Sequence, residues 1–114
     1  MPSITFAATQ MACDWDLEAN VERAESLIRE AASAGAQVVL LQELFETPYF
    51  CQDESEAHFH LARPLEANPL IERFQALASE LEVVLPLSFY ECSGNTAFNS
   101  LVMIDADGAN LGLY

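Results

Sequence analysis

The sequence contains no lysine, and arginine supplies all 4 of its basic side chains. Acidic side chains number 18, so the chain of 114 residues carries a formal net charge of −14. Surfaces that bind nucleic acid or anionic lipid need clustered positive charge. The composition therefore argues against both kinds of partner and leaves small cationic molecules as compatible ligands.

Long apolar runs are also missing, as is the basic start with an apolar stretch that marks a signal peptide. Cysteine occurs only at Cys13, Cys51 and Cys92, an odd set without the spacing of a disulfide framework or a zinc site. Free thiols of this kind are typical of reducing compartments. We therefore expect a cytoplasmic protein with no membrane segment.

What the sequence does have is an apolar content of 52%, enough for the modest core of one small domain over residues 1–114. Residues 4–10 are rich in β-branched and small apolar side chains, which predicts a first strand. The next apolar residues recur at helical spacing, with Asp16 placed to cap the start and Gly35 the end. Residues 38–41 predict a strand buried on both faces. Strand, helix and strand in this order predict a parallel βαβ unit and an α/β fold.

The second half of the chain predicts a helix followed by three strands. Asn68 and Pro69 form a cap followed by a proline at the first helical position. Strands are expected at residues 83–90, 98–105 and 109–114, with turns at 94–95 and 105–108 and the last two strands antiparallel. Pro86 lacks a backbone donor and predicts a bulge or bend. The polar stretch over residues 52–60 predicts a short helix.

Glu43 follows the strand over residues 38–41, at the C-terminal end where open α/β sheets carry their chemistry. A carboxylate buried there can serve as a general base whose proton affinity is tuned by its surroundings. It can equally cap the next turn or pair with an arginine, and spacing alone leaves both interpretations open. Glu46, three residues further on, is expected to be solvated.

Several other side chains near this position have chemistry of their own. His58 and His60 are two residues apart, a spacing that suits adjacent metal ligands only on a strand, so we expect surface histidines and no metal site. Cys51 has acidic neighbours, which disfavour a reactive thiol. Tyr49 and Phe50 form an aromatic turn and either line an apolar substrate pocket beside the carboxylate or pack in the core.

Four segments of the chain match a known pattern in the same order, and the likeness covers essentially the whole sequence. They are residues 42–52 (QELFETPYFCQ), 83–91 (VVLPLSFYE), 95–100 (NTAFNS) and 104–108 (IDADG) followed by 111–114 (LGLY). These segments resemble the nitrilase, or carbon-nitrogen hydrolase, superfamily, and most closely its N-carbamoylputrescine amidase branch. The resemblance implies a nitrilase-like αββα sandwich, of which this chain supplies about the N-terminal five strands and two to three helices.

The resemblance also implies a Glu-Lys-Cys triad, with Glu43 at the position of the general base toward the thiol. In such a triad the Lys stabilises the oxyanion and the Cys forms a covalent acyl-enzyme. The reaction implied for the branch converts N-carbamoylputrescine to putrescine, CO2 and ammonia in polyamine biosynthesis, without metal or organic cofactor. A cationic ureido substrate and a homo-oligomeric longer parent are implied in the same way.

The chain departs from the family pattern because it lacks the other two members of the triad. The family's Lys comes just beyond the segment matched by residues 111–114, and its nucleophile lies further on, so Cys13, Cys51 and Cys92 do not match it. We therefore expect residues 1–114 to be the N-terminal portion of one carbon-nitrogen hydrolase domain, inactive alone. The alternatives are a β-ureidopropionase or aliphatic amidase, or a truncated, non-catalytic interaction module that pairs through its open last strand.

Overall fold

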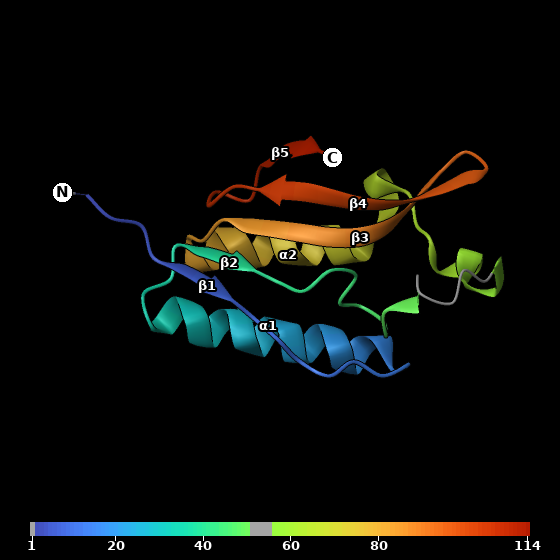
Figure 1. Cartoon of the computed structure of the whole chain (residues 1–114). Helices are drawn as coiled ribbons and strands as arrows, with labels where there is room; N and C mark the ends of the chain where they lie inside the picture. The colour runs from blue at the N-terminus through green and yellow to red at the C-terminus, as the bar shows by residue number, and fades with distance from the viewer. Residues whose placement is uncertain (1, 51–55) are drawn as a thin grey trace.

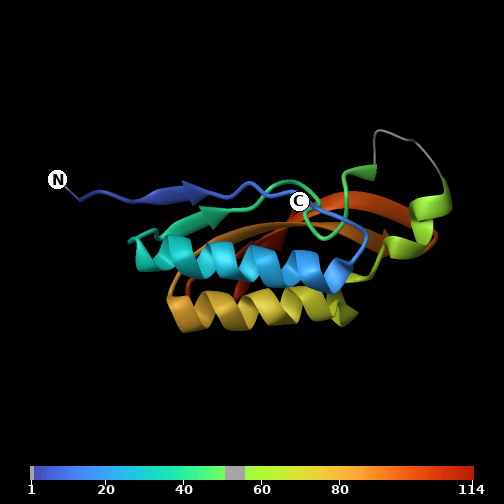
Figure 2. The ribbon, with the colours of Figure 1, turned by 90° about the horizontal axis from the view of Figure 1, so that it is seen from below.

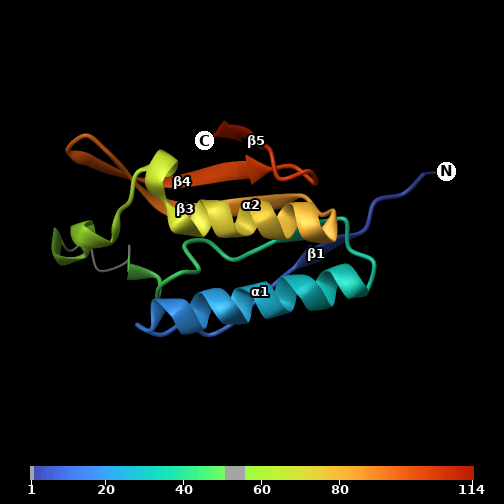
Figure 3. The same cartoon turned by 180° about the vertical axis from the view of Figure 1, so that it is seen from behind.

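The computed structural model describes residues 2–50 and 56–114. In Figure 1 a layer of strands lies in front of two helices, α1 (Leu17–Ser33) and α2 (Pro69–Leu81). Seen from below, the two helices lie side by side along one side of the strand layer (Figure 2). The view from behind gives the same arrangement (Figure 3). Both helices therefore cover the same face of the strand layer.

Helix α1 begins and ends at the residues that the sequence predicts. The Asp16 carboxylate accepts a hydrogen bond from the backbone N–H of Ala19 at 3.1 Å and so caps the first turn. At the other end, Gly35 has a φ of +99°, the left-handed conformation that commonly ends a helix. The predicted roles of Asp16 at the start of this helix and Gly35 at its end are thus confirmed.

Helix α2 likewise confirms its predicted start. The Asn68 side-chain oxygen accepts a hydrogen bond from the backbone N–H of Leu70 at 3.0 Å, and Pro69 occupies the first helical position, where no donor is needed. The helix ends at Glu82, which adopts the left-handed conformation with a φ of +55°. No glycine stands there, so this end was not marked in the sequence.

Strands β1 (Phe6–Ala8) and β2 (Val38–Leu40) pair in parallel, which confirms the βαβ unit. Strand β2 also joins the strand that follows α2. The backbone N–H of Val39 donates to the carbonyl oxygen of Val84 at 3.0 Å, and the N–H of Val84 donates to the carbonyl oxygen of Gln37 at 2.9 Å. These two bonds make one continuous layer of the strands.

Three antiparallel strands complete the layer in the order β3 (Leu85–Ser93), β4 (Thr96–Ile104) and β5 (Asn110–Leu113). The predicted turns between them are confirmed, with Gly94 at a φ of +61° in the first and Gly108 at a φ of +89° in the second. All residues of β5 are exposed.

The predicted bulge at Pro86 is wrong, because Pro86 stands opposite Met103 in an unbroken β3–β4 register. The backbone N–H of Val84 points toward β2, and by strand alternation so does the nitrogen of Pro86. The bridge to β2 stops at Val84, so the proline removes no ladder bond. The irregularity lies instead between Met103 and Ile104, opposite β5.

The hydrophobic core lies between the two helices and the sheet face they cover, and its largest fully buried side chains include Phe45, Phe74 and Phe89. The expectation that residues 38–41 are buried on both faces is wrong. Val39 and Leu41 are buried, whereas Leu40 is 47% exposed. The physical reason is that the helices cover one face only.

Two 3-10 helices, η2 (Glu56–Leu61) and η3 (Leu65–Ala67), lie in the connection from β2 to α2. The first of them confirms a short helix within the polar stretch. Residues 51–55, and with them Cys51, lie outside the described residues. Within the described ranges, no helix is both long and apolar enough to cross a membrane.

Candidate active site

Glu43 lies just beyond β2, at the start of a turn held by two strands. The next residue, Leu44, has a φ of +49°, a left-handed conformation that costs a branched residue about 1–2 kcal/mol. Its backbone N–H donates to the Ser88 hydroxyl on β3 at 2.9 Å. Because Leu44 and Phe45 are buried, the turn sends these two side chains into the core and points Glu43 out of it.

The Glu43 side chain is exposed, so the expectation of a buried carboxylate is wrong for this chain. The reason is that successive side chains of a strand point to opposite faces, so a strand covered on one face can place the side chain that follows it on the uncovered face. Partner groups are nevertheless present. The Asn99 carboxamide on β4 donates a hydrogen bond to the Oε1 atom of Glu43.

A cavity of about 390 Å³ opens at this carboxylate. It is lined by Leu40, Leu41, Glu43, Ser88, Asn99, Ser100, Leu101 and Tyr114. Apolar walls with a few converging polar groups are the usual composition of a small-molecule site. A carboxylate held by a neutral amide in such a cavity can accept a proton from a nucleophile.

Tyr49 and Phe50 lie elsewhere, and neither is among the described residues that line the Glu43 cavity. Phe50 is buried and packs edge-on against Tyr90, with the ring centroids 4.9 Å apart, and against His58 at 5.1 Å. Tyr49 is exposed. Their assignment to the substrate pocket stays a prediction.

His58 belongs to the same aromatic cluster. The His58 ring stacks on Trp15 with the centroids 5.4 Å apart and the planes 13° from parallel. His60 lies on the same 3-10 helix, η2. In the part of the chain that the structure describes, no three His, Cys, Asp or Glu side chains are grouped as metal ligands.

Of the two described cysteines, Cys13 lies near the β2 turn, where its thiol donates to the carbonyl oxygen of Phe45 at 3.1 Å and accepts from the Gln42 amide at 3.3 Å. Burial raises the pKa of the Cys13 thiol above its usual value, although the Arg23 charge opposes this. A thiol held in its protonated form is a poor nucleophile. Cys13 is therefore suited to packing.

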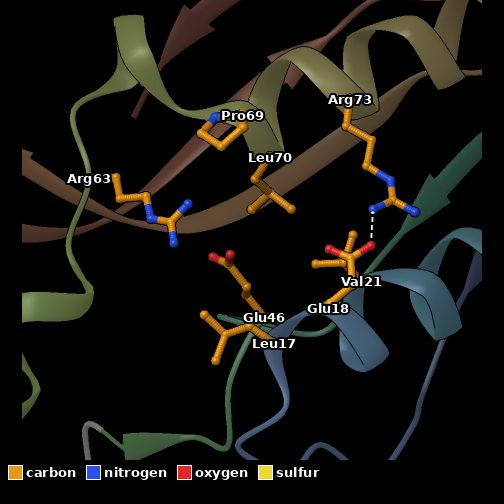
Figure 4. Close-up of a pocket in the computed structure, with 8 residues that line it drawn as sticks. All are labelled: Leu17, Glu18, Val21, Glu46, Arg63, Pro69, Leu70 and Arg73. Atoms are coloured by element: carbon orange, nitrogen blue, oxygen red, sulfur yellow. Dashed lines mark hydrogen bonds and ion pairs between the residues drawn. The ribbon is translucent and has the colours of Figure 1, made fainter.

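A second pocket, of about 270 Å³, lies on the helix-covered side between the first turns of α1 and α2 (Figure 4). Glu46 and Arg63 point toward each other across it, and Arg73 bonds Glu18 at 2.9 Å. Burial raises the pKa of the Glu46 carboxyl, while the Arg63 charge lowers it. Glu46 was expected to be solvated, so sequence reasoning missed its partial burial, and no nearby pattern signals Arg63 as its neighbour.

The fold and this carboxylate define an α/β domain with a candidate general base after its second strand. The model of the carbon-nitrogen hydrolase family matches residues 5–114. The chain belongs to that family, as the sequence resemblance indicates.

Curated relatives agree with this assignment. The N-carbamoylputrescine amidase of Oryza sativa subsp. japonica is 54% identical over 112 residues, and that of Solanum lycopersicum is 51% identical over 111 residues. The citrullinase of Francisella tularensis is 37% identical over 114 residues. The plant matches cover 97% of this chain but 37% of each relative, and the citrullinase match covers 100% and 40%.

Solved structures confirm the nitrilase-like fold. A carbon-nitrogen hydrolase from Helicobacter pylori superposes with a TM-score of 0.87 at 31% identity, covering 97% of this chain and 38% of its own. Saccharomyces cerevisiae Nit3 superposes with a TM-score of 0.81 at 22% identity, covering 97% and 43%, and supports the fold alone. The chain thus supplies a part of the family's fold.

Proposed function

We propose that this chain is the N-terminal portion of a carbon-nitrogen hydrolase domain that hydrolyses N-carbamoylputrescine. Glu43 is the general base toward a cysteine thiol in a Glu-Lys-Cys triad, and the products are putrescine, CO2 and ammonia. A linear ureido substrate with a cationic end agrees with the net charge of −14.

One observation carries the proposal: Glu43 lines a cavity of about 390 Å³ at the C-terminal end of β2. The surrounding chain is 51% identical over 111 residues to the Solanum lycopersicum N-carbamoylputrescine amidase. A proton acceptor at a cavity mouth is the part of the triad that this segment can supply. The Lys and the nucleophilic Cys come from the rest of the longer parent, which we propose is a cytoplasmic homo-oligomer.

A segment-exchange experiment tests the proposal. Residues 1–114 replace the matched segment of the Solanum lycopersicum relative, and ammonia release from N-carbamoylputrescine is measured. We expect turnover, and a loss of about 10²-fold to 10⁴-fold in kcat for Glu43→Gln, because a general base contributes that much. Glu22→Gln, an exposed change on α1, is the matched control. A folded chimera without turnover, or a Glu43→Gln chimera at full rate, would contradict the proposal.

A second candidate function is hydrolysis of a ureido amino acid, favoured by the 37% identity to the Francisella tularensis citrullinase. Citrulline carries a carboxylate beside its distal amine, whereas N-carbamoylputrescine ends in an ammonium alone. A site for citrulline therefore needs a cationic group at that end of the pocket. Offering both substrates to the chimera separates the two, since the ratio of their kcat/KM values reports that difference.

A further inference from the structure

Two neighbouring strands hold two consecutive residues of the turn after β2. On β3, the Ser88 hydroxyl accepts the backbone N–H of Leu44 at 2.9 Å. On β4, the Asn99 carboxamide donates to the Oε1 atom of Glu43. The Glu43 carboxylate and the backbone N–H of Leu44 are thus each held by a different strand of the sheet.

Strand register places both contacts on the sheet face away from the helices. Ser88 stands opposite Leu101, and Asn99 is two residues before Leu101 on the same strand, so Ser88 and Asn99 are diagonal neighbours on one face. The adjacent residues Leu87 and Val102, which stand opposite each other, are fully buried in the core under the helices. The Glu43 carboxylate therefore reaches the uncovered face.

The Asn99 carboxamide is a suitable hydrogen-bond donor for a carboxylate that acts as a general base. Asn99 donates without carrying charge, so it can hold Oε1 in place without the strong stabilisation of the anion that an arginine or lysine would provide. Because the Asn99 bond occupies Oε1, we assign proton uptake at the cavity to the second carboxylate oxygen, Oε2. Orientation of a reacting group within a narrow range is a large part of catalytic rate.

We propose that Asn99 is a positioning residue that holds the Glu43 carboxylate at the cavity mouth through Oε1. The proposal rests on the proposed function for its catalytic meaning. The geometric part of the proposal, that the Asn99 amide fixes the Glu43 side chain, can be tested without any activity. Neither the Asn99 side chain nor its role was singled out by the sequence, because Asn99 is 56 residues from Glu43.

The test is solution NMR on the labelled 114-residue chain. In the wild type we expect one Glu43 side-chain rotamer; in Asn99→Ala we expect averaged couplings and a Glu43 side-chain order parameter below about 0.6, the flexible range. Asn95→Ala, the same truncation in the β3–β4 turn, should leave Glu43 unchanged. Should Asn99→Ala fail to fold, Asn99→Asp keeps the shape, removes the donor and should give the same averaging.

A second measurement reads the bond itself. The Asn99 amide protons should shift with pH as their carboxylate acceptor takes up a proton, and should stay constant in Glu43→Gln. The Gln75 amide is the control, because it donates to the backbone carbonyl of Gly108 at 3.0 Å, which does not titrate. A Glu43 side chain equally ordered in wild type and Asn99→Ala, or a pH-independent Asn99 amide, would overturn the proposal. An inactive chimera with both signals intact would instead overturn the proposed function.

Discussion

Glu43 and Glu46 lie three residues apart, and their carboxylates face opposite sides of the sheet. Glu43 accepts a bond from Asn99 on the uncovered face, whereas Glu46 faces Arg63 in the pocket between α1 and α2. The left-handed turn at Leu44 separates them. Two carboxylates that look alike in the sequence therefore have different surroundings, and each can be tested on its own.

Glu46 makes the stability of the chain depend on pH. Burial raises its pKa above the ordinary value of 4.5, so the folded state binds this proton more tightly than the unfolded state. Its contribution to the free energy of unfolding is full below the ordinary pKa and is lost as the pH rises through the raised folded pKa. We expect Glu46→Gln to be more stable than wild type at pH 7, with the difference vanishing below pH 4.5.

Urea unfolding midpoints at neutral and acidic pH measure this difference. Glu22→Gln, which neutralises an exposed carboxylate on α1, is the control and should show no such convergence. A Glu46→Gln variant less stable than wild type at neutral pH would mean that the attraction of Arg63 outweighs the cost of burial.

Asn20 is fully buried and connects two loops. Its amide donates to the carbonyl oxygens of Asp14 at 2.6 Å and Glu46 at 3.0 Å, and its oxygen accepts from the Asp14 N–H at 3.1 Å. Asn20→Ala leaves these buried groups unpaired, so we expect the free energy of unfolding to fall by about 1–3 kcal/mol. Chemical denaturation measures the loss, and a value within about 0.5 kcal/mol of wild type, the range of neutral surface changes, would contradict this role.

Ser88→Ala removes the acceptor of the Leu44 N–H at the strained turn. A buried donor left without a partner costs about 1–3 kcal/mol, and the turn that presents Glu43 should loosen. Hydrogen exchange of the Leu44 amide is the direct measurement, and we expect it to accelerate more than the global loss of stability explains. Ser93→Ala, at the exposed end of β3, is the control. Unchanged protection at Leu44 would show that packing alone holds the turn.

The 114-residue chain by itself should release no ammonia from N-carbamoylputrescine. It has no lysine, and by the family pattern none of its cysteines, Cys13, Cys51 and Cys92, stands at the position of the nucleophile. Glu43 therefore lacks the thiol that it activates in the proposed triad. Members of a catalytic triad act as a unit, and loss of the nucleophile removes several orders of magnitude in rate. A coupled ammonia assay of the purified chain, with Glu43→Gln as the blank, checks this. Release above that blank would overturn the expectation.

In the chimera with the Solanum lycopersicum relative, Asn99→Ala should lower kcat by about 10-fold to 100-fold and leave KM unchanged, because misplacing a reacting group slows chemistry more than binding. Steady-state kinetics with N-carbamoylputrescine measure both constants. Asn95→Ala should match the parent chimera. An effect on KM alone would instead place Asn99 in substrate binding.

Signals confined to short stretches of sequence were sufficient for most of the architecture. The caps at Asp16 and Asn68 act within one helical turn, and both are confirmed. The prediction that both faces of β2 are buried was wrong, because the exposure of Leu40 depends on which face of the sheet the helices cover. The prediction of a bulge at Pro86 was wrong for a similar reason. The sheet accommodates this proline because the bridge to β2 stops at Val84, which the sequence does not show.

The sequence by itself determined the two α-helices, the sequence of strands along the chain, the family resemblance and Glu43 as the candidate catalytic residue. Those features depend on periodicity and capping, whose interacting groups lie within a few residues of each other. The tertiary structure alone decided that Glu43 is exposed, that Asn99 holds it and that Glu46 is desolvated beside Arg63. Each of these depends on contacts between distant segments, which exist only once the strands have paired and the helices have covered one face.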